Sequence, residues 1–153
     1  MTGPAAIEIR AFRGTDQAAV KALVLAGLKD HFGTIDPALN PDLNDVMKSY
    51  VARGAVVVVA EWDGRLVGTG TLMPERPGVG RLVRVSVDRS CRGQGLGRRL
   101  VHHLLGAARG LGLRRVLVET TEDWQDAIGL YRACGFADDG VRDGDIHLSL
   151  DLS

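Results

Sequence analysis

The sequence is poor in the features that mark disulfide-rich, zinc-binding and nucleic-acid-binding proteins. Its two cysteines, Cys91 and Cys134, lie far apart, with no C-x-x-C spacing and no histidine-rich partner segment, so neither a disulfide framework nor a zinc site is indicated. Acidic and basic residues balance at 19 each, and only 5% of the residues are aromatic, so nothing indicates a polyanion held through bulk charge and stacking. We therefore expect no metal and no nucleic acid partner.

The sequence also lacks signals for export and for membrane insertion. It shows no charged-then-apolar leader and no apolar run long enough to cross a bilayer. We expect a cytoplasmic protein with reduced thiols and no membrane partner. With 153 residues, 45% of them hydrophobic, the chain has the size of one ordinary domain. Cys91 is interpreted as a small loop residue, because no histidine in its sequence context would activate it as a nucleophile.

The most informative stretch runs from Arg81 to Leu105. An apolar, β-branched run from Leu82 to Val87 predicts a buried strand, and the turn R-G-Q-G-L-G at positions 92–97 leads directly into an amphipathic helix. Glycines at the positive end of a helix expose backbone N–H groups, which predicts a site for a phosphate-bearing ligand. Arg98 stands where a dinucleotide-binding G-x-G-x-x-G pattern needs glycine, and no Gly-Lys-Ser/Thr follows to make a nucleotide-triphosphate loop.

Hydrophobic periodicity and turn residues predict an α/β fold with the element order βααβββαβαββ. The predicted strands and helices, in that order, are Ile7–Phe12, Gln17–Phe32, Asp42–Ala52, Ala55–Trp62, Leu66–Met73, Leu82–Val87, Leu96–Ala108, Arg115–Thr120, Asp126–Cys134, Phe136–Val141 and Asp145–Leu150. Between them we expect a loose loop at Thr34–Pro41 and a Pro/Gly-rich link at Pro74–Gly80. No repeat or linker divides the chain, so we expect one domain over residues 1–153.

Three segments together resemble the GNAT superfamily of N-acetyltransferases. The turn matches the R/Q-x-x-G-x-G/A signature of that family, with Arg92, Gly95 and Gly97 in register. V-S-V-D precedes it at positions 85–88, and A-I-G-L-Y-R-A-C-G-F at positions 127–136 looks like the A-x-x-L/F-Y-x-x-x-G-F segment of the family. The resemblance covers the whole chain, and it implies the GNAT acyl-CoA N-acyltransferase fold, a mixed central sheet flanked by helices, with acetyl-CoA as co-substrate.

In the family that the chain resembles, the loop amides bind the pyrophosphate of coenzyme A. The residues that this implies here are Arg92, Gly93, Gln94, Gly95, Leu96, Gly97 and Arg98. The resemblance also implies a bulged central strand that splays from its neighbour, so that the pantetheine arm pairs with the backbone of Val85, Ser86 and Val87. A backbone N–H there would stabilise the oxyanion that forms during acetyl transfer. The alternative is a tight strand-to-helix turn without a ligand.

Two side chains are candidates for proton transfer. The resemblance implies that Tyr131, four residues before the Gly-Phe pair of the motif, protonates the departing thiolate; the alternative is a core aromatic residue. Glu119 lies twelve residues before Tyr131, where ribosomal-protein N-terminal acetyltransferases of this superfamily have a glutamate. A buried carboxylate at the end of a strand would suit a general base, and a structural cap on the following loop is the alternative.

The sequence departs from the family pattern at two places. Trp124 stands seven residues before the tyrosine, where the family often has an asparagine that contacts the pantetheine. The central strand carries Arg81 and Arg84, whereas many members have a glutamate base on this strand. The identity of the base therefore stays open, since an amine that is already neutral needs none.

The expected reaction is transfer of an acetyl group from acetyl-CoA to a primary amine, by direct attack in a ternary complex. The acceptor is a small amine, an amino acid or a protein amino group, and the sequence does not choose among them. Candidates for its pocket, each with packing or surface exposure as the alternative, are His31, Phe32, Tyr50 and His147. Exchange of the terminal hairpin between two copies would give a homodimer. The rival hypothesis is an acetyl-CoA-binding sensor or partner module without catalysis.

Overall fold

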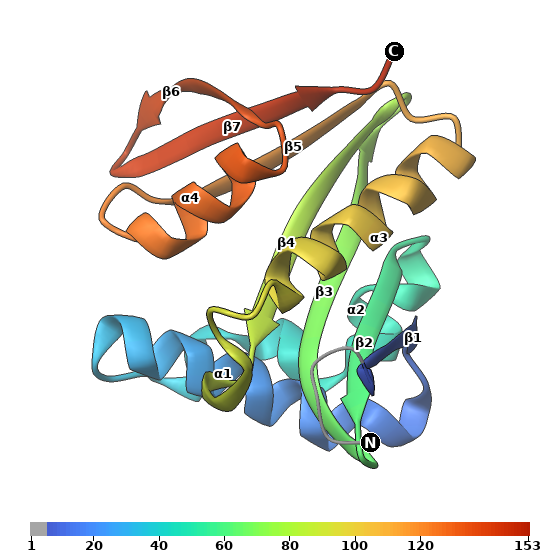
Figure 1. The fold of residues 1–153 in the computed structure, drawn as a ribbon, viewed down its shortest axis with the longest axis vertical. Helices are drawn as coiled ribbons and strands as arrows, with labels where there is room; N and C mark the ends of the chain where they lie inside the picture. Colours follow the sequence, from blue (N-terminus) through green and yellow to red (C-terminus); the bar gives the residue numbers. More distant parts are fainter. Residues whose placement is uncertain (1–5) are drawn as a thin grey trace.

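The computed structural model of the protein describes residues 6–153 (Figure 1). Its strands are β1 (Glu8–Ala11), β2 (Val56–Trp62), β3 (Arg65–Arg76), β4 (Val79–Val87), β5 (Arg115–Thr121), β6 (Ala137–Arg142) and β7 (Asp145–Asp151). Its α-helices are α1 (Gln17–Phe32), α2 (Val46–Ser49), α3 (Leu96–Gly110) and α4 (Gln125–Ala133). The element order is the predicted βααβββαβαββ.

The seven strands form one mixed sheet in the order β1-β2-β3-β4-β5-β7-β6. Every neighbouring pair is antiparallel except β4 and β5, which are parallel and are connected through α3. Parallel neighbours require such a crossover, whereas the β2–β3, β3–β4 and β6–β7 pairs are hairpins closed by short turns. The chain also passes through helices between β1 and β2 and between β5 and β6.

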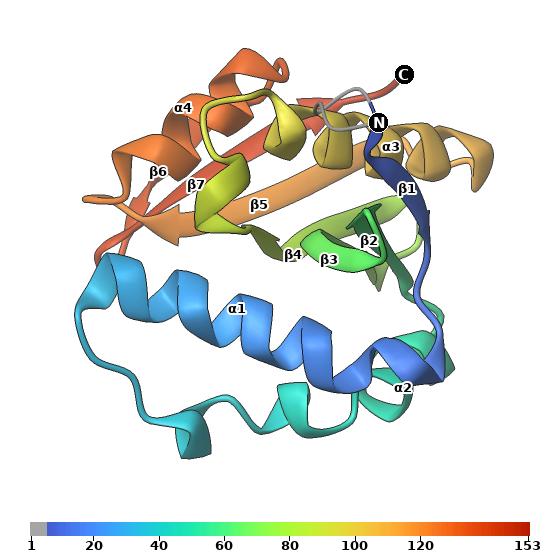
Figure 2. The ribbon, with the colours of Figure 1, turned by 60° about the horizontal axis from the view of Figure 1, so that its bottom comes forward.

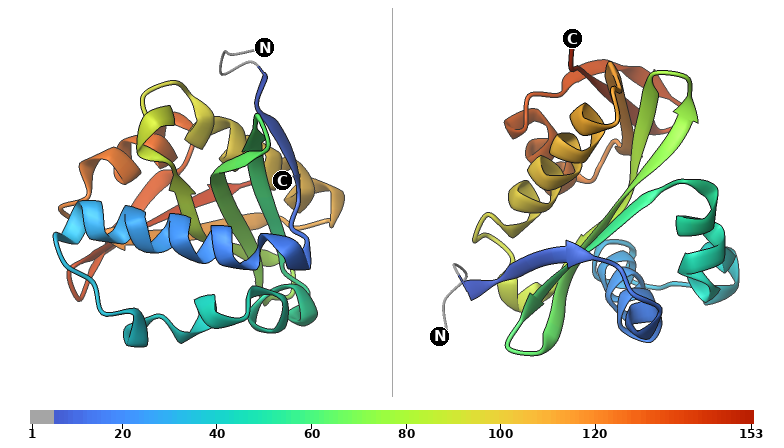
Figure 3. Two further views of the ribbon diagram at one scale, coloured as in Figure 1. Left: turned by 90° about the horizontal axis from the view of Figure 1, so that it is seen from below. Right: turned by 90° about the vertical axis from the view of Figure 1, so that its right-hand side faces the viewer.

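Helices cover both faces of the sheet. Helix α1 and the α2 region lie on one face, and α3 and α4 lie on the other (Figure 2). The long β3–β4 hairpin runs between these two layers (Figure 3). Strand β2 alternates between two cores, because Val58 and Ala60 pack toward α3 while Val57 and Val59 pack toward α1. This double burial explains why the segment reads as a continuous apolar run rather than as an alternating one.

The turn signals of the sequence are confirmed. Asp63-Gly64 and Asp143-Gly144 close two hairpins with positive φ at both central residues, 54° and 78° in the first and 54° and 81° in the second. Gly33 ends α1 with φ 82°. These elements could be placed from sequence because short-range backbone chemistry determines them.

Two predicted segments are wrong in their boundaries. The helix predicted over Asp42–Ala52 is α-helical only at Val46–Ser49, with single 3₁₀ turns at Pro41–Asn44 and Val51–Arg53. The Asp45 side chain accepts a hydrogen bond from the Lys48 amide at 3.0 Å and so starts a new helix inside the predicted one. The predicted link at Pro74–Gly80 is instead mostly strand, because β3 and β4 meet at a turn of only two residues, 77 and 78.

Candidate active site

Strands β4 and β5 diverge soon after they pair. Their register covers only Val79↔Arg115, Gly80↔Val116 and Arg81↔Leu117. Beyond Arg81, the edge of β4 that faces β5 has no strand partner in residues 6–153. A cavity of about 410 Å³ opens at this divergence, and its lining includes Val85, Ser86, Val87, Arg92, Trp124 and Tyr131. This opening between β4 and β5, here called the wedge, can accept an extended ligand as an additional strand.

Strand β4 is bulged on its other edge. Its pairing with β3 jumps from Thr71↔Val83 to Thr69↔Ser86, so that two residues of β4, Arg84 and Val85, stand opposite a single residue of β3. Arg84 has φ 54°, a left-handed conformation that is uncommon for a residue other than glycine. The bulge and the splay that the resemblance implied are both present.

The glycine loop connects β4 to α3 through two left-handed residues. Gly93 has φ 74°, and Gly95, the N-cap of α3, has φ 82°. A Cβ atom added at either glycine would have no neighbour within 4 Å, so the start of the helix is open. The first helical hydrogen bond runs from the Arg99 amide to the Gly95 carbonyl, and the preceding amides have no helical partner. A cavity of about 340 Å³ lies here, lined by Arg92, Gly93, Gly95, Leu96, Gly97 and Arg98 among others.

Gly97 is required for a different reason. It is helical, and a Cβ atom there would lie 3.2 Å from Cδ2 of Leu130 on α4. The third glycine of the motif therefore permits close packing of α3 against α4, whereas the first two supply backbone geometry.

Ion pairs connect the loop to α1. Arg92 donates to the Val87 carbonyl at 3.2 Å and to Oδ2 of Asp30 at 3.0 Å, and Arg89 donates to Oδ1 of the same carboxylate at 2.6 Å. Although desolvation opposes the shift, the two arginines hold the pKa of Asp30 below its ordinary value. Gln94 donates to the Ser90 carbonyl at 3.4 Å within the loop and is absent from the lining of both cavities.

Tyr131 lies on α4 and is both a core residue and a wall of the larger cavity. It is 6% exposed, and its ring packs edge-on against Phe136 at 5.8 Å. Burial, with a smaller contribution from Cys134, raises the pKa of the Tyr131 phenol above its ordinary value. The hydroxyl therefore stays protonated throughout the neutral range, as a proton donor must.

Glu119 is exposed, so it lacks the burial that would suit a general base. Its side chain is 46% exposed and lies on the α1 face of β5, because Val116 and Val118 occupy the opposite face in the core with α3. Oε2 lies 3.4 Å from Nδ1 of His147, its cross-strand partner, and 3.9 Å from Nη1 of Arg81. Tyr131 and Glu119 thus belong to opposite faces of the sheet, on either side of the wedge.

Trp124, at the position where the family often has an asparagine, forms an aromatic cluster with the end of α1. Its ring stacks on His31 with centroids 4.0 Å apart and 6° between the planes. Phe32, 51% exposed, packs edge-on against both rings. His31 also contacts Oγ1 of Thr121 and Oδ1 of Asp123, each at 3.4 Å. Of the predicted acceptor-pocket residues, His31 lines the larger cavity and Phe32 supports it from outside.

The other two predicted pocket residues have different surroundings. Tyr50 is 7% exposed and belongs to the core under α1, and its hydroxyl donates to Asp42. His147 pairs with Glu119 across β5 and β7. The residue that sequence reasoning missed is Asp42, which pairs with Arg84 at the β4 bulge. The signal was an arginine in the middle of an otherwise apolar strand, since a charge placed there requires a partner.

Within residues 6–153, no group of three or more His, Cys, Asp or Glu side chains is arranged to hold a metal ion. No helix in this part of the chain has the length and apolar character needed to cross a membrane.

Comparison with known proteins places this geometry in context. The sequence profile of the acetyltransferase (GNAT) family matches residues 27–136. The chain is 37% identical over 112 residues to N-acetyltransferase 8B from Homo sapiens, an alignment that covers 69% of this chain and 49% of that protein. The chain therefore spans about half the length of this relative. It is 33% identical over 128 residues to glucosamine 6-phosphate N-acetyltransferase 1 from Oryza sativa, covering 77% of this chain and 76% of that protein.

Solved structures share the fold at low sequence identity. A GNAT-family acetyltransferase from Staphylococcus aureus Mu50 superposes with a TM-score of 0.88 at 19% identity, covering 97% of this chain and all of that one, 100%. A PaiA N-acetyltransferase from Thermoplasma acidophilum, solved in complex with coenzyme A, superposes with a TM-score of 0.83 at 13% identity and covers 95% of this chain and 99% of that one. At these identities the likeness concerns the fold.

Proposed function

The chain belongs to the GNAT family of acetyltransferases, and from that premise we propose that it transfers the acetyl group of acetyl-CoA to a primary amine by direct attack in a ternary complex. The observation that carries the proposal is the wedge between β4 and β5, where the bulged strand, Tyr131 and the open start of α3 line adjoining cavities. Bound there, the thioester would supply the activated acetyl group.

The residues present fit coenzyme A. Backbone amides from Gly93 to Arg98 would hold the pyrophosphate, because no side chain covers the start of α3 at the two left-handed glycines. The unpaired edge of Val85–Val87 would pair with the pantetheine arm, and an N–H of this segment would stabilise negative charge on the acetyl carbonyl oxygen. Arg92 would keep the loop in place through Asp30.

Proton transfer is assigned to both faces of the sheet. The amine nitrogen bonds to the acetyl carbon, the carbon–sulfur bond breaks, and the sulfur takes a proton from Tyr131. Glu119 takes a proton from the nitrogen, directly or through water, and both groups recover their starting states by exchange with solvent. A buried thiolate is also disfavoured by desolvation, so the raised pKa of Tyr131 does not prevent the transfer.

Glu119→Gln is expected to lower kcat/KM about tenfold at neutral pH, because removal of the base leaves deprotonation of the ammonium to water. The deficit should shrink as the pH rises, since the amine then loses its proton without help. The measurement is kcat/KM of the wild type and of Glu119→Gln for one acceptor between about pH 6.5 and 9.5. His147→Asn, which alters the histidine that pairs with Glu119, is measured in parallel. A deficit that stays constant over this range would contradict the assignment.

The proposed chemistry does not select one class of acceptor amine. Small amines, amino acids and protein amino groups are all candidates, and the relatives differ in this respect by their names: one is a glucosamine 6-phosphate N-acetyltransferase. One domain over residues 1–153, a cytoplasmic location and a dimer formed by hairpin exchange stay predictions.

Calorimetric titration with acetyl-CoA and with coenzyme A tests the cofactor site, and release of thiol in the presence of amines tests transfer. The amines are spermidine, glucosamine 6-phosphate, free amino acids and a peptide that begins with alanine. We expect binding of both ligands, and thiol release that depends on one class of amine. A folded protein that binds neither ligand would refute the proposal.

A sensor module that binds acetyl-CoA without catalysis is the second candidate. It is favoured by the Trp124–His31 stack, which lines the cavity beside Tyr131 where the family often has an asparagine, and by arginines on β4 in place of a glutamate. Binding without thiol release for every amine would support it, and acetyl transfer to any amine would exclude it.

A further inference from the structure

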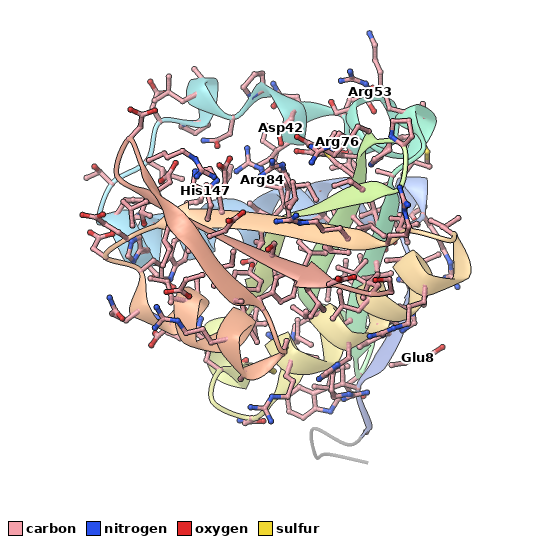
Figure 4. The ribbon with its side chains drawn as sticks, turned by 90° about the horizontal axis from the view of Figure 1, so that it is seen from above. Glu8, Asp42, Arg53, Arg76, Arg84 and His147 are labelled. Atoms are coloured by element: carbon pink, nitrogen blue, oxygen red, sulfur yellow. The ribbon has the colours of Figure 1, made fainter. Side chains whose placement is uncertain are left out.

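The left-handed residue at the β4 bulge is held by its side chain. Arg84 donates to Asp42 through two hydrogen bonds, Nε to Oδ2 at 3.0 Å and Nη2 to Oδ1 at 2.7 Å. Nη2 also donates to Oδ1 of Asn40 at 3.0 Å. The side chains of Arg84 and Asp42 point toward one another from β4 and from the segment that precedes α2 (Figure 4). Only 23% and 27% of these side chains is exposed, so water competes weakly for their charges.

The Asp42 carboxylate is also held by a residue of the core that lies under α1. The hydroxyl of Tyr50 donates to Oδ2 of Asp42. Burial and this hydrogen bond raise the pKa of Tyr50 to about 12, so the phenol remains a donor at neutral pH. Although desolvation opposes it, donation from Arg84 and Tyr50 lowers the pKa of Asp42, which stays ionised.

The segment that carries Asp42 is fixed to α1. Gln17 donates to the Leu43 carbonyl at 2.7 Å and accepts from the Val46 amide at 2.8 Å. The side chain of Leu43 is almost completely buried. Asp42 is therefore an anchored partner rather than a mobile surface group, and it can transmit the position of the α1 layer to the bulge.

We propose that Arg84, held by Asp42, is a positioning residue that fixes the β4 bulge so that a backbone N–H of Val85–Val87 faces the acetyl carbonyl oxygen. The inference rests on the proposed function, because it concerns the same wedge. Arg84 itself touches no reacting atom. A planar guanidinium that donates two parallel hydrogen bonds fixes direction, which a lysine ammonium cannot do. The ion pair would thus maintain a backbone conformation that an isolated strand would relax.

The direct readout is the amide NMR spectrum, which is accessible for a chain of 16.4 kDa. In the wild type, at least one amide of Val85–Val87 should shift differently with acetyl-CoA than with coenzyme A, since only the former carries the carbonyl. In Asp42→Asn and in Arg84→Lys this difference should be lost, while the dissociation constant for coenzyme A changes less than about threefold.

Turnover provides the second readout. Loss of alignment should lower kcat about 100-fold in Asp42→Asn. Arg84→Lys combined with Asp42→Asn should be no worse than about twofold below the poorer single variant, because the two residues act as a unit. Asp138→Asn is the matched control. It alters the exposed pair in which Arg132 on α4 donates two hydrogen bonds to Asp138 on β6, and it should leave kcat unchanged.

The outcomes separate the two proposals. Failure of the wild type to bind acetyl-CoA would refute the proposed function and this inference together. Binding by the wild type, with an acetyl-specific amide shift that persists in both single variants, would overturn this inference alone. Equal losses of kcat, coenzyme A affinity and thermal stability would also overturn it, since they would indicate a merely structural ion pair. Arg84→Lys keeps the test valid if Asp42→Asn does not fold.

Discussion

Gly95→Glu is expected to raise the dissociation constant for acetyl-CoA by a factor on the order of 100 or more. Gly95 is the left-handed N-cap of α3, with φ 82° and open space where a side chain would project. A glutamate there places bulk and negative charge where the pyrophosphate would lie, and its carboxylate competes for the same amides. Calorimetric titration of the purified variant with acetyl-CoA measures the loss.

Gly112→Glu is the matched control for this variant. Gly112 follows the other end of α3, has φ 76°, and also has no neighbour within 4 Å of an added Cβ atom. The two variants share the backbone strain, about 1 to 2 kcal/mol for a side chain in the left-handed region, and the added charge. Gly112→Glu should bind acetyl-CoA like the wild type. Equal binding by Gly95→Glu and the wild type would show that the loop is only a turn.

Tyr131→Phe is expected to lower kcat about 100-fold while acetyl-CoA affinity stays within about threefold of the wild type. The substitution removes one oxygen from a ring that is otherwise buried against Phe136, so the packing is retained. Without the phenol the leaving sulfur must take its proton from water, a donor that is not held in position. Steady-state kinetics with a saturating amine, together with calorimetry, separate the two effects.

Phe136→Leu provides the comparison for Tyr131→Phe. It alters the contact between the rings of Tyr131 and Phe136 but keeps the Tyr131 hydroxyl. We expect a lower melting temperature with kcat changed less than about threefold. Unchanged turnover of Tyr131→Phe would remove the tyrosine from the mechanism, and a similar fall in both variants would assign the effect to packing.

Most of the fold could be predicted because its signals are local. Paired turn residues placed the hairpins at Gly64 and Gly144, and the glycine loop with its apolar flanks placed β4 and α3. The bounds of the helix predicted over Asp42–Ala52 were wrong because Asp45 is an N-cap inside an apolar pattern, and hydrophobic periodicity does not reveal such a cap. The Pro/Gly-rich link was wrong because the β3–β4 pairing tolerates Pro74 opposite Gly80.

The candidate site could be predicted only where one segment carries it. The loop and Tyr131 lie in contiguous motifs, whereas the arrangement around them comes from distant contacts. The Trp124–His31 stack joins the N-cap of α4 to α1, and the Arg84–Asp42 pair joins β4 to the segment before α2. The exposure of Glu119 depends on which layer covers its face of the sheet, which strand alternation alone does not give.

The short β4–β5 register also bears on how the chain folds. Strands β1 to β4 join through antiparallel neighbours, and β2 to β4 through short turns, so most of these contacts form over small sequence separations. The three parallel pairs of β4 and β5 must wait for the segment that contains α3 to close, a step with higher loop entropy. We therefore expect the wedge to be completed after the β2–β3–β4 hairpins. A ligand bound there would act mainly by slowing unfolding, with little effect on the rate of folding.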